Sequence, residues 1–471
     1  MALTFYNTRS RRQEVFEPLV EGKISIYVCG ITVYDRCHVG HARSLIFFDT
    51  IVRYLRWRGY DVTFVRNITD IEDKIINRAA ELGIPWEELT ENMIGEMHRD
   101  VTALGCLMPD IEPRATQNVP EMLDLIRRLE ERGLAYVVGE GDVYFSVGDF
   151  AEYGGLSGRN LDDMLAGARV DVDDRKRSPA DFALWKSVKP GEPSWPSPWG
   201  AGRPGWHLEC SAMSAKHLGQ PFDIHGGGED LVFPHHENEL AQSCGATGEE
   251  FVRYWLHHAF VRIDQEKMSK SLGNVFAIQD VLEELEPEGL RLHLLSTHYR
   301  SPLDFNAEGI ADSTTALKRM YETMARAVEA GVEDPGFDFE SSEASAVVEA
   351  MDDDFNTAKA VGIAFESGRE LRRCLDGDDL AGARRAFGLI RAVGAGLGLF
   401  LKDPGEFLES LRSRGVDRVG VDPAEVESLI EQRLEARRQK DFATSDRIRD
   451  ELAGRGILLE DGPDGTTWRP A

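Results

Sequence analysis

The chain has 471 residues, 42% of them hydrophobic, so it is too long for one core and predicts three or four globular units. Its apolar runs are well short of the roughly 20 residues that cross a bilayer, and its first residues lack the apolar core of a signal peptide. Six irregularly spaced cysteines argue against a disulfide framework. We therefore expect a cytoplasmic protein without a membrane partner.

The formal net charge of −28 counts against a nucleic-acid partner, because phosphates are neutralised by lysine and arginine. The charge is unevenly spread, however. Residues 327–358 contain ten acids and no lysine or arginine, whereas residues 433–455 contain seven basic residues against five acids. An acidic body with a local basic contact zone is therefore possible, and its binding should weaken steeply as salt rises.

The first elements in chain order form a predicted β-α-β unit. Residues 24–29 are mostly apolar and β-branched or aromatic, and Gly30 ends this buried strand. A helix is expected from about residue 41 until Gly59, and residues 61–65 predict a second strand. The apolar positions that indicate the helix are Leu45, Phe48, Ile51, Val52 and Leu55.

His38-Val39-Gly40-His41 lies between the first strand and this helix. Nucleotides bind at such strand ends in open α/β sheets, where a helix N-terminus faces the phosphates. Gly40 would let an adenine ring approach the backbone, and His38 and His41 could donate hydrogen bonds to phosphate oxygens. Two ordinary loop histidines explain this motif alone equally well.

A second motif, Lys267-Met268-Ser269-Lys270-Ser271, is expected in a late loop. Lys267 and Lys270 could close over a triphosphate and neutralise the charge that develops as pyrophosphate leaves. A solvated basic loop is the alternative. The chain has no G-x-x-x-x-G-K-[ST] sequence, so phosphate binding must come from elements such as these two motifs.

Together the two motifs resemble the HIGH and KMSKS signatures of class I aminoacyl-tRNA synthetases. Longer strings narrow the resemblance to the cysteinyl-tRNA synthetase family, over nearly the whole chain. They are Thr32-Val33-Tyr34-Asp35, Asn67-Ile68-Thr69-Asp70, Arg203-Pro204-Gly205-Trp206-His207, His225-Gly226-Gly227-Gly228 and Phe233-Pro234-His235-His236-Glu237-Asn238-Glu239. Val39 in place of isoleucine is the one visible departure in the first signature, and it is conservative.

The resemblance implies an α/β fold with a doubly wound, Rossmann-like parallel-sheet catalytic domain, followed by an α-helical bundle and a small anticodon-binding domain. It divides the chain into 1–115 (catalytic, first half), 116–204 (connective insertion), 205–255 (catalytic, second half with zinc ligands), 256–310 (stem-contact region with the KMSKS loop), 311–402 (helical bundle) and 403–471 (anticodon-binding domain). Within the later parts, helical patterns cover 306–330, 342–374, 382–399, 424–438 and 441–454. Asp352-Asp353-Asp354-Phe355-Asn356 lies at a helix boundary, Asp403-Pro404-Gly405 predicts a short linker, and 456–468 predicts a strand-turn-strand unit.

A metal site is weakly indicated by spacing alone. His235 and Glu239 are four residues apart, so a helix starting near Pro234 would place them on one face. Cys29 and Cys210 could complete a tetrahedral zinc site, but no sequence rule prefers them to the other cysteines. Without the family, buried free cysteines are the better explanation. The resemblance places the zinc ligands on Cys29, Cys210, His235 and Glu239.

The resemblance also implies substrate and tRNA contacts. Trp206 would lie against the bound cysteine, while Thr69 and Asp230 would hold its ammonium group. Arg437, Asp446 and Asp461 match the positions that read the anticodon. Each of these residues also has a plain structural alternative, as a packing aromatic, a turn hydroxyl or a solvated charge.

The implied activity is a two-step ligase reaction. L-cysteine attacks the α-phosphorus of ATP, with Mg²⁺ accompanying the nucleotide, and the 3′ end of tRNA(Cys) then accepts the activated cysteine. One Zn²⁺ per chain would select cysteine, since a coordinating thiol is deprotonated outright and a serine hydroxyl binds zinc poorly. We expect a monomer.

Two alternatives remain. A ligase that joins cysteine to an amino sugar shares the catalytic core and the zinc site, but lacks a C-terminal unit such as residues 433–468. A non-catalytic paralogue that binds tRNA or cysteine should show decay of its motifs. Here both signatures and all four implied zinc ligands are intact.

Overall fold

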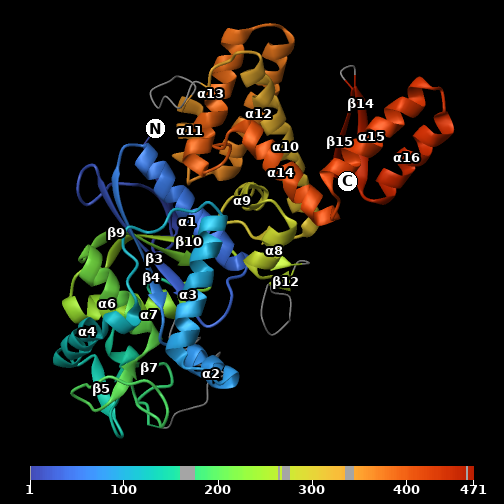
Figure 1. Cartoon of the computed structure of the whole chain (residues 1–471). Coiled ribbons are helices and arrows are strands. Elements are labelled where there is room, and N and C mark those ends of the chain that lie inside the picture. Colours follow the sequence, from blue (N-terminus) through green and yellow to red (C-terminus); the bar gives the residue numbers. More distant parts are fainter. Residues whose placement is uncertain are drawn as a thin grey trace.

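The structure is a computed structural model that describes residues 2–159, 175–263, 266–267, 276–334, 344–462 and 465–470. Figure 1 shows an N-terminal α/β part, a helical bundle packed on it, and a small C-terminal unit set to one side. Within the described residues, no helix is long and apolar enough to cross a membrane.

Four parallel strands form the central sheet in the order β10-β9-β3-β4. They are β3 (Lys23–Thr32), β4 (Asp61–Thr69), β9 (Phe222–Gly228) and β10 (Val252–His258). α1 (Val39–Trp57) joins β3 to β4, which confirms the predicted β-α-β unit, although the helix begins two residues earlier than expected. The chain builds outward from β3 in one direction and from β9 in the other. The doubly wound sheet is therefore confirmed, and its strand order reverses between β3 and β9.

Helices cover both faces of the sheet (Figure 1). They are α2 (Asp73–Leu82), α3 (Trp86–Ala103), α4 (Val119–Glu131), α6 (Trp206–Leu218) and α7 (Glu237–Thr247). Successive side chains of β3 point to opposite faces of the sheet. Ile24, Ile26 and Val28 pack with α1 and α3 on one face, whereas Tyr27 and Cys29 pack with α4, α6 and α7 on the other. Cys29 thus leaves β3 on the face that α4, α6 and α7 cover.

A hairpin and an antiparallel sheet flank this core. The hairpin is β1 (Thr4–Asn7) and β2 (Arg12–Val15). The antiparallel sheet lies between the two halves of the central sheet in sequence and consists of β5 (Ala135–Val138), β6 (Asp142–Phe145), β7 (Phe182–Ser187) and β8 (Gly202–Pro204). Short helical turns span Ala115–Gln117, Val147–Asp149 and Val232–His236.

After the central sheet the chain becomes mainly helical. The elements are β11 (Val261–Ile263), β12 (Glu266–Lys267), α8 (Ile278–Glu284), α9 (Pro287–Leu295), β13 (Leu303–Asp304), α10 (Ala307–Glu329), α11 (Ala344–Met351), α12 (Thr357–Asp376), α13 (Leu380–Leu397) and α14 (Pro404–Val419). The predicted boundary at 352–356 is confirmed, because Asp354 and Phe355 adopt positive φ angles of 58° and 48° between α11 and α12.

The short linker predicted at Asp403-Pro404-Gly405 is wrong. These residues open α14, because the Asp403 carboxylate accepts the Glu406 backbone N–H at 3.0 Å and caps the helix. Phe407 then packs on Tyr321 of α10 with ring centroids 3.8 Å apart. A tertiary contact therefore stabilises a helix whose start resembles a turn in the sequence.

The C-terminal unit confirms the predicted two helices followed by a strand pair. Its elements are α15 (Pro423–Arg438), α16 (Phe442–Gly454), β14 (Ile457–Gly462) and β15 (Gly465–Pro470). Trp468 is buried in its core, and Arg412 of α14 lies over the Trp468 ring, 4.6 Å from the centroid. This contact links the unit to the end of the bundle.

Candidate active site and metal centre

The carboxyl ends of β3 and β9 open onto a cavity of about 340 Å³, where the strand order reverses. His38, Gly40 and His41 line this cavity from the N-terminus of α1. The His38 backbone N–H donates to Nδ1 of His41 at 3.2 Å, and the two rings stack with centroids 3.7 Å apart. The imidazoles of His38 and His41 and the positive end of α1 therefore form one wall of the cavity, which suits an anionic phosphate. We call this side the phosphate wall.

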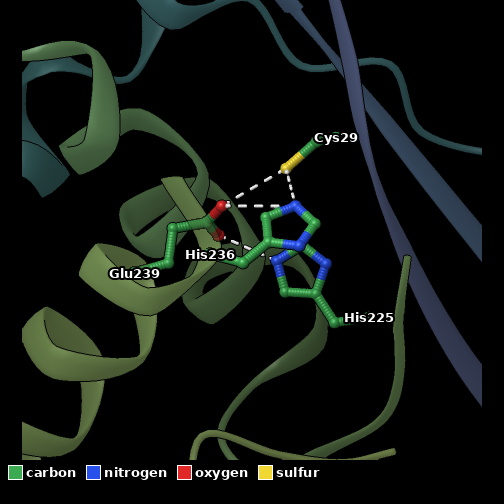
Figure 2. A group of neighbouring side chains, drawn as sticks. All are labelled: Cys29, His225, His236 and Glu239. Carbon is green, nitrogen blue, oxygen red and sulfur yellow. Dashed lines mark hydrogen bonds and ion pairs between the residues drawn. The ribbon is translucent and has the colours of Figure 1, made fainter. Parts of the chain in front are cut away.

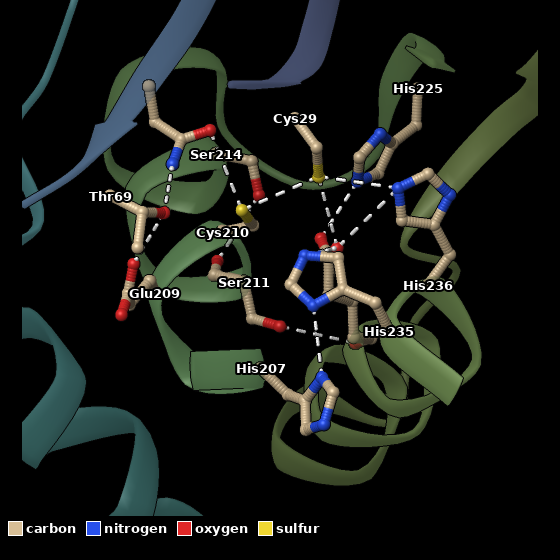
Figure 3. A network of polar contacts seen from close by, with 12 residues as sticks. Cys29, Thr69, His207, Glu209, Cys210, Ser211, Ser214, His225, His235 and His236 are labelled. Carbon is tan, nitrogen blue, oxygen red and sulfur yellow. Dashed lines mark hydrogen bonds and ion pairs between the residues drawn. The ribbon is translucent and has the colours of Figure 1, made fainter. Parts of the chain in front are cut away.

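Trp206 and Asp230 line the same cavity. Trp206 begins α6, and its ring stacks on His235 with centroids 4.3 Å apart. Thr69 is not among the lining residues: its buried hydroxyl donates to Glu209 at 2.9 Å (Figure 3). Burial, and next the Cys210 thiol, raise the pKa of Glu209 well above its usual range. The structure thus brings two of the three expected substrate contacts to the histidine motif.

The lysine motif falls mostly outside the described residues. Lys267 ends β12, whose backbone pairs with β11, but its side chain and residues 268–275, including Lys270, are not described. The chain that follows is anchored at the histidine motif. The Val39 N–H donates to the Phe276 carbonyl at 3.1 Å, and the Ile278 N–H donates to the Cys37 carbonyl at 2.9 Å. Phe276, the first described residue after the lysine motif, therefore lies beside the histidine motif, and the roles of both lysines stay predictions.

Cys29, which lines this cavity, comes together with Cys210, His235 and Glu239, from which it is far away in sequence. Figure 3 labels Cys29, Cys210 and His235, and Figure 2 labels Glu239. All four are buried, and their candidate ligand atoms lie within 4.8 Å of one another. Cys29 Sγ is 3.4 Å from Cys210 Sγ and 3.3 Å from Glu239 Oε1. His235 Nε2 is 3.0 Å from Glu239 Oε1. His235 precedes α7 in an irregular turn, so the expected single helix is only partly formed, but the pair still meets.

Charge in this cluster favours a cation. Burial alone would raise the pKa of Glu239, but His225 and His235 hold it well below its usual range. Burial likewise opposes ionisation of Cys210, yet hydrogen bonds with Cys29 and His235 lower its pKa to about 6. Without a metal the His235 imidazolium compensates this negative charge, because burial lowers the pKa of His235 but Glu239 and Cys210 raise it to about 10. A metal ion could replace that proton, and the two sulfurs, imidazole and carboxylate form a donor set that fits one.

Three further histidines belong to the site and were missed as site residues by sequence analysis. His225 Nε2 is 2.8 Å from Glu239 Oε2, and His236 Nε2 is 3.3 Å from Cys29 Sγ (Figure 2). With Cys29 and Glu239 they make a second set of possible ligands within 4.8 Å. His207 Nδ1 lies 2.9 Å from Nδ1 of His235. The signal was present, because all three occur in the sequence strings that carry the resemblance.

The three expected anticodon residues lie in the C-terminal unit. Asp461 forms a bidentate ion pair with Arg433, with both N–O distances 2.8 Å, and a 3.0 Å pair with Arg437. Asp446 is exposed on α16, 3.4 Å from Arg449. The structure brings Arg437 and Asp461 together around Arg433, a nearly buried residue that sequence analysis did not single out.

Family models match most of the chain. Residues 15–315 match the catalytic domain of class I (C) tRNA synthetases, residues 346–402 match the DALR domain, and residues 422–469 match the cysteinyl-tRNA ligase anticodon binding domain.

Full-length relatives agree with these matches. The cysteine–tRNA ligase of Alkalilimnicola ehrlichii is 56% identical over 467 residues, covering 99% of both chains. Those of Geobacter sulfurreducens and Halorhodospira halophila are each 53% identical, the first covering 100% of both chains and the second 99%.

Solved structures share the fold at low identity. Mycobacterium tuberculosis methionyl-tRNA synthetase bound by methionyl-adenylate has a TM-score of 0.58 at 16% identity, covering 86% of this chain and 95% of that one. The leucyl-tRNA synthetase of an Agrobacterium radiobacter ternary complex has a TM-score of 0.54 at 12% identity, covering 84% and 86%. With the sheet, the cavity and the full-length relatives, these findings show that the chain belongs to the cysteine–tRNA ligase family of class I aminoacyl-tRNA synthetases.

Proposed function

We propose that the chain activates L-cysteine with ATP, forming cysteinyl-adenylate and pyrophosphate, and then transfers cysteine to the 3′ end of tRNA(Cys). One observation carries the proposal: a single cavity is lined by the histidine motif and by Cys29 of the metal cluster. A phosphate-binding wall and a thiol-binding wall thus share one space. The match to an anticodon binding domain supports tRNA as the acceptor and counts against an amino sugar.

The activation step needs positioning and charge stabilisation more than proton transfer. His38 and His41 would donate to phosphate oxygens, and Gly40 would let the adenine approach the backbone. Lys267 and Lys270 would neutralise the leaving pyrophosphate, with Mg²⁺ bound to ATP. The hydrogen bond from the Val39 N–H to the Phe276 carbonyl supports this division, because Phe276 follows the lysine motif in sequence and lies at the N-terminus of α1.

Cys29, Cys210, His235 and Glu239 would hold Zn²⁺, since two sulfurs, one imidazole and one carboxylate form a donor set typical of that ion. Bound zinc would supply a Lewis acid that accepts the substrate thiolate and disfavours serine. Trp206 would pack against the amino acid. Its stacking on His235 places that ring beside the cluster.

Asp230 would pair with the substrate ammonium from the cavity wall. We propose that Thr69 supports the same contact indirectly, because its hydroxyl donates a hydrogen bond to the buried Glu209. In the second step the terminal ribose hydroxyl attacks the activated carbonyl and an ester bond forms. The bond to AMP breaks, and the hydroxyl proton leaves with the AMP phosphate or to water.

We further propose that Arg437, Asp446 and Asp461 contact the anticodon, and that the protein is a cytoplasmic monomer. Salt-dependent tRNA binding by the acidic chain would then come from local basic zones such as 433–455. The domain division given by sequence analysis belongs to the same proposal.

The test is ATP–pyrophosphate exchange with cysteine or serine, together with zinc analysis and tRNA charging. Cys210→Ser should lose zinc and lower cysteine-dependent exchange by about 100-fold or more. Cys244→Ser, which changes a half-buried cysteine outside the cluster, is the matched control. Lys270→Ala should lower exchange while leaving cysteine binding nearly intact. Exchange that does not depend on cysteine, or an unaffected Cys210→Ser variant, would contradict the proposal.

A further inference from the structure

A network of polar side chains leads from the metal cluster to the N-terminal hairpin. Nε2 of His236 lies 3.3 Å from Cys29 Sγ (Figure 2), and Nδ1 of the same ring lies 2.7 Å from Nε2 of His257. Nδ1 of His257 lies in turn 2.7 Å from the Thr8 hydroxyl. Both histidines are buried, and Thr8 is half-buried. We call Thr8, His257 and His236 the Thr8 network.

Backbone contacts fix the outer end of the Thr8 network. Thr8 follows β1, and its backbone N–H donates to the Trp255 carbonyl of β10 at 3.0 Å. The Asn7 side chain spans the same two strands: its Oδ1 accepts the Trp255 N–H at 3.1 Å, and its Nδ2 donates to the Arg253 carbonyl at 3.2 Å. Because His257 also lies in β10, the hairpin and the strand hold the Thr8 hydroxyl against its ring.

The two ends of the network lie at different cavities. Thr8 and His257 line a second cavity of about 760 Å³, which adjoins the active-site cavity at Asp230 and Phe260. Cys29, at the inner end, lines the active-site cavity itself. Thr8 and His257 are not among the described residues that line the active-site cavity. An effect of Thr8 on a substrate there must therefore pass through the two histidines.

The charge on Cys29 decides which ring nitrogens carry hydrogen. A sulfur that ligates a metal is a thiolate, which accepts hydrogen bonds and has no hydrogen to donate. Nε2 of His236 must then carry the hydrogen, so that its Nδ1 accepts from Nε2 of His257. Burial, and next the neighbouring His225, lower the pKa of His257 to about 3, so this ring is neutral and its Nδ1 is a bare acceptor. The hydroxyl of Thr8 is the donor that this acceptor needs.

His236 acts on a metal ligand rather than as one. Cys29, Cys210, His235 and Glu239 already supply the four donors of a tetrahedral site. A hydrogen bond to a ligating thiolate draws electron density from the sulfur and leaves the metal a stronger acceptor for a further ligand. The substrate thiolate of the proposed reaction would then be bound more tightly.

We propose that Thr8 and His257 are positioning residues of the metal site: they fix the tautomer of His236, which donates to Cys29 Sγ and so strengthens the binding of cysteine. The inference rests on the proposed function, since it concerns the thiol-binding side of the same site. It assigns a role in substrate selection to a hydroxyl that is separated from the nearest proposed ligand by two imidazoles.

Thr8→Val tests the network by replacing one hydroxyl with a methyl group. Valine has nearly the same shape but neither donates nor accepts a hydrogen bond. Nδ1 of His257 then loses its donor, or the ring changes tautomer and turns a bare nitrogen toward His236. In Co²⁺-substituted protein the thiolate-to-cobalt absorption band should move to longer wavelength, because the Cys29 sulfur becomes a stronger electron donor.

The kinetic test separates the two substrates of ATP–pyrophosphate exchange. The KM for cysteine should rise about fivefold in Thr8→Val, because one buried hydrogen bond is worth about two- to tenfold in a binding constant. The KM for ATP should stay within about twofold of the parent. Thr8→Ser retains the hydroxyl and should match the parent in the band and in both KM values. His257→Phe interrupts the network at the next residue and should shift the band in the same direction as Thr8→Val.

Thr4→Val is the matched control. Thr4 lies in the same hairpin and is also half-buried, but its hydroxyl donates to the Asp352 carbonyl at 3.0 Å. This variant should keep the parental band and both KM values, and thermal melting shows whether each variant is folded. A parental band and cysteine KM in Thr8→Val, the same changes in Thr4→Val, or an equal rise of both KM values would overturn the assignment.

Nitrogen NMR of labelled histidine tests the tautomers directly, at fixed pH and without catalysis. In the zinc-loaded parent, His236 and His257 should each carry hydrogen on Nε2 and a bare Nδ1, and Thr8→Val should change the pattern of His257. Hydrogen on Nδ1 of either ring in the parent would refute the proposed network. Absence of cysteine-dependent exchange in the zinc-loaded parent would instead refute the proposed function, and the tautomer measurement would still decide the role of Thr8.

Discussion

His207→Phe should weaken zinc binding although it replaces none of the proposed zinc ligands. His207 Nδ1 lies 2.9 Å from Nδ1 of His235, on the side of the ring away from the Nε2 that is 3.0 Å from Glu239. Burial, and next the neighbouring His235, hold the pKa of His207 well below its usual range, so it is neutral at pH 7. Phenylalanine therefore keeps a ring of similar size and changes no charge, but removes the hydrogen bond that orients the ligand.

The magnitude follows from what remains around His235. Loss of such an outer partner typically costs about 10–100-fold in metal affinity. The Trp206 ring still stacks on His235 with centroids 4.3 Å apart, so part of its orientation survives. We expect a zinc dissociation constant about 30-fold higher than that of the parent, which corresponds to about 2 kcal/mol.

The assay is competition for zinc against a chromophoric chelator at fixed pH, because ligand deprotonation makes the affinity pH-dependent. His217→Phe is the control: His217 lies on the same helix, α6, but near its C-terminal end and partly exposed. Cysteine-dependent exchange at limiting zinc should fall with the affinity and recover at high zinc. An affinity of His207→Phe within twofold of the parent, or an equal loss in His217→Phe, would refute the reasoning.

Three further changes test other parts of the structure. Gly30→Ala should destabilise the protein by more than about 3 kcal/mol in urea unfolding, because the new Cβ would lie 1.6 Å from the Asn67 carbonyl oxygen. Gly362→Ala serves for comparison, since Gly362 is exposed on α12 and a Cβ there meets nothing within 4 Å. Arg291→Met should cost about 3 kcal/mol, since it leaves the buried Asp49 carboxylate with one arginine instead of two, and a cost below 1 kcal/mol would contradict this. Two arginines and a threonine lower the pKa of Asp461, so its ion pairs stabilise the C-terminal unit above the unfolded pKa of about 3.9 and are lost as pH falls below it. Asp461→Asn should therefore flatten the acid limb of thermal melting curves, and an unchanged limb would count against the ion pairs.

Local patterns in the sequence were sufficient for much of the fold. The apolar run at 24–29 and the helical spacing after it correctly predicted β3, α1 and β4, because one sheet and its covering helices bury these residues by simple periodicity. α14 was missed, because its start carries proline and glycine. Its stability comes from Phe407 packing on Tyr321, a partner that is far away in sequence.

The candidate site likewise contains residues that local sequence patterns indicated and residues that they did not. The two signatures indicated phosphate binding from residue types alone, whereas the four metal ligands required a family resemblance, since six cysteines offer no preferred spacing. His225 and His236 were visible in the quoted strings but had no stated role. Their contacts with Glu239 and Cys29 exist only because β9 and α7 meet beside the end of β3.

The sequence by itself determined the nucleotide-binding unit, the helical character of the second half, and the family to which the chain belongs. Only the tertiary structure decided that the histidine motif and Cys29 of the metal cluster line one cavity, and that a second cavity adjoins it at Asp230 and Phe260. The physical reason is that hydrophobic periodicity and capping act over a few residues, whereas a site is formed where strand ends from distant segments converge. The strand order reversal between β3 and β9 creates that convergence.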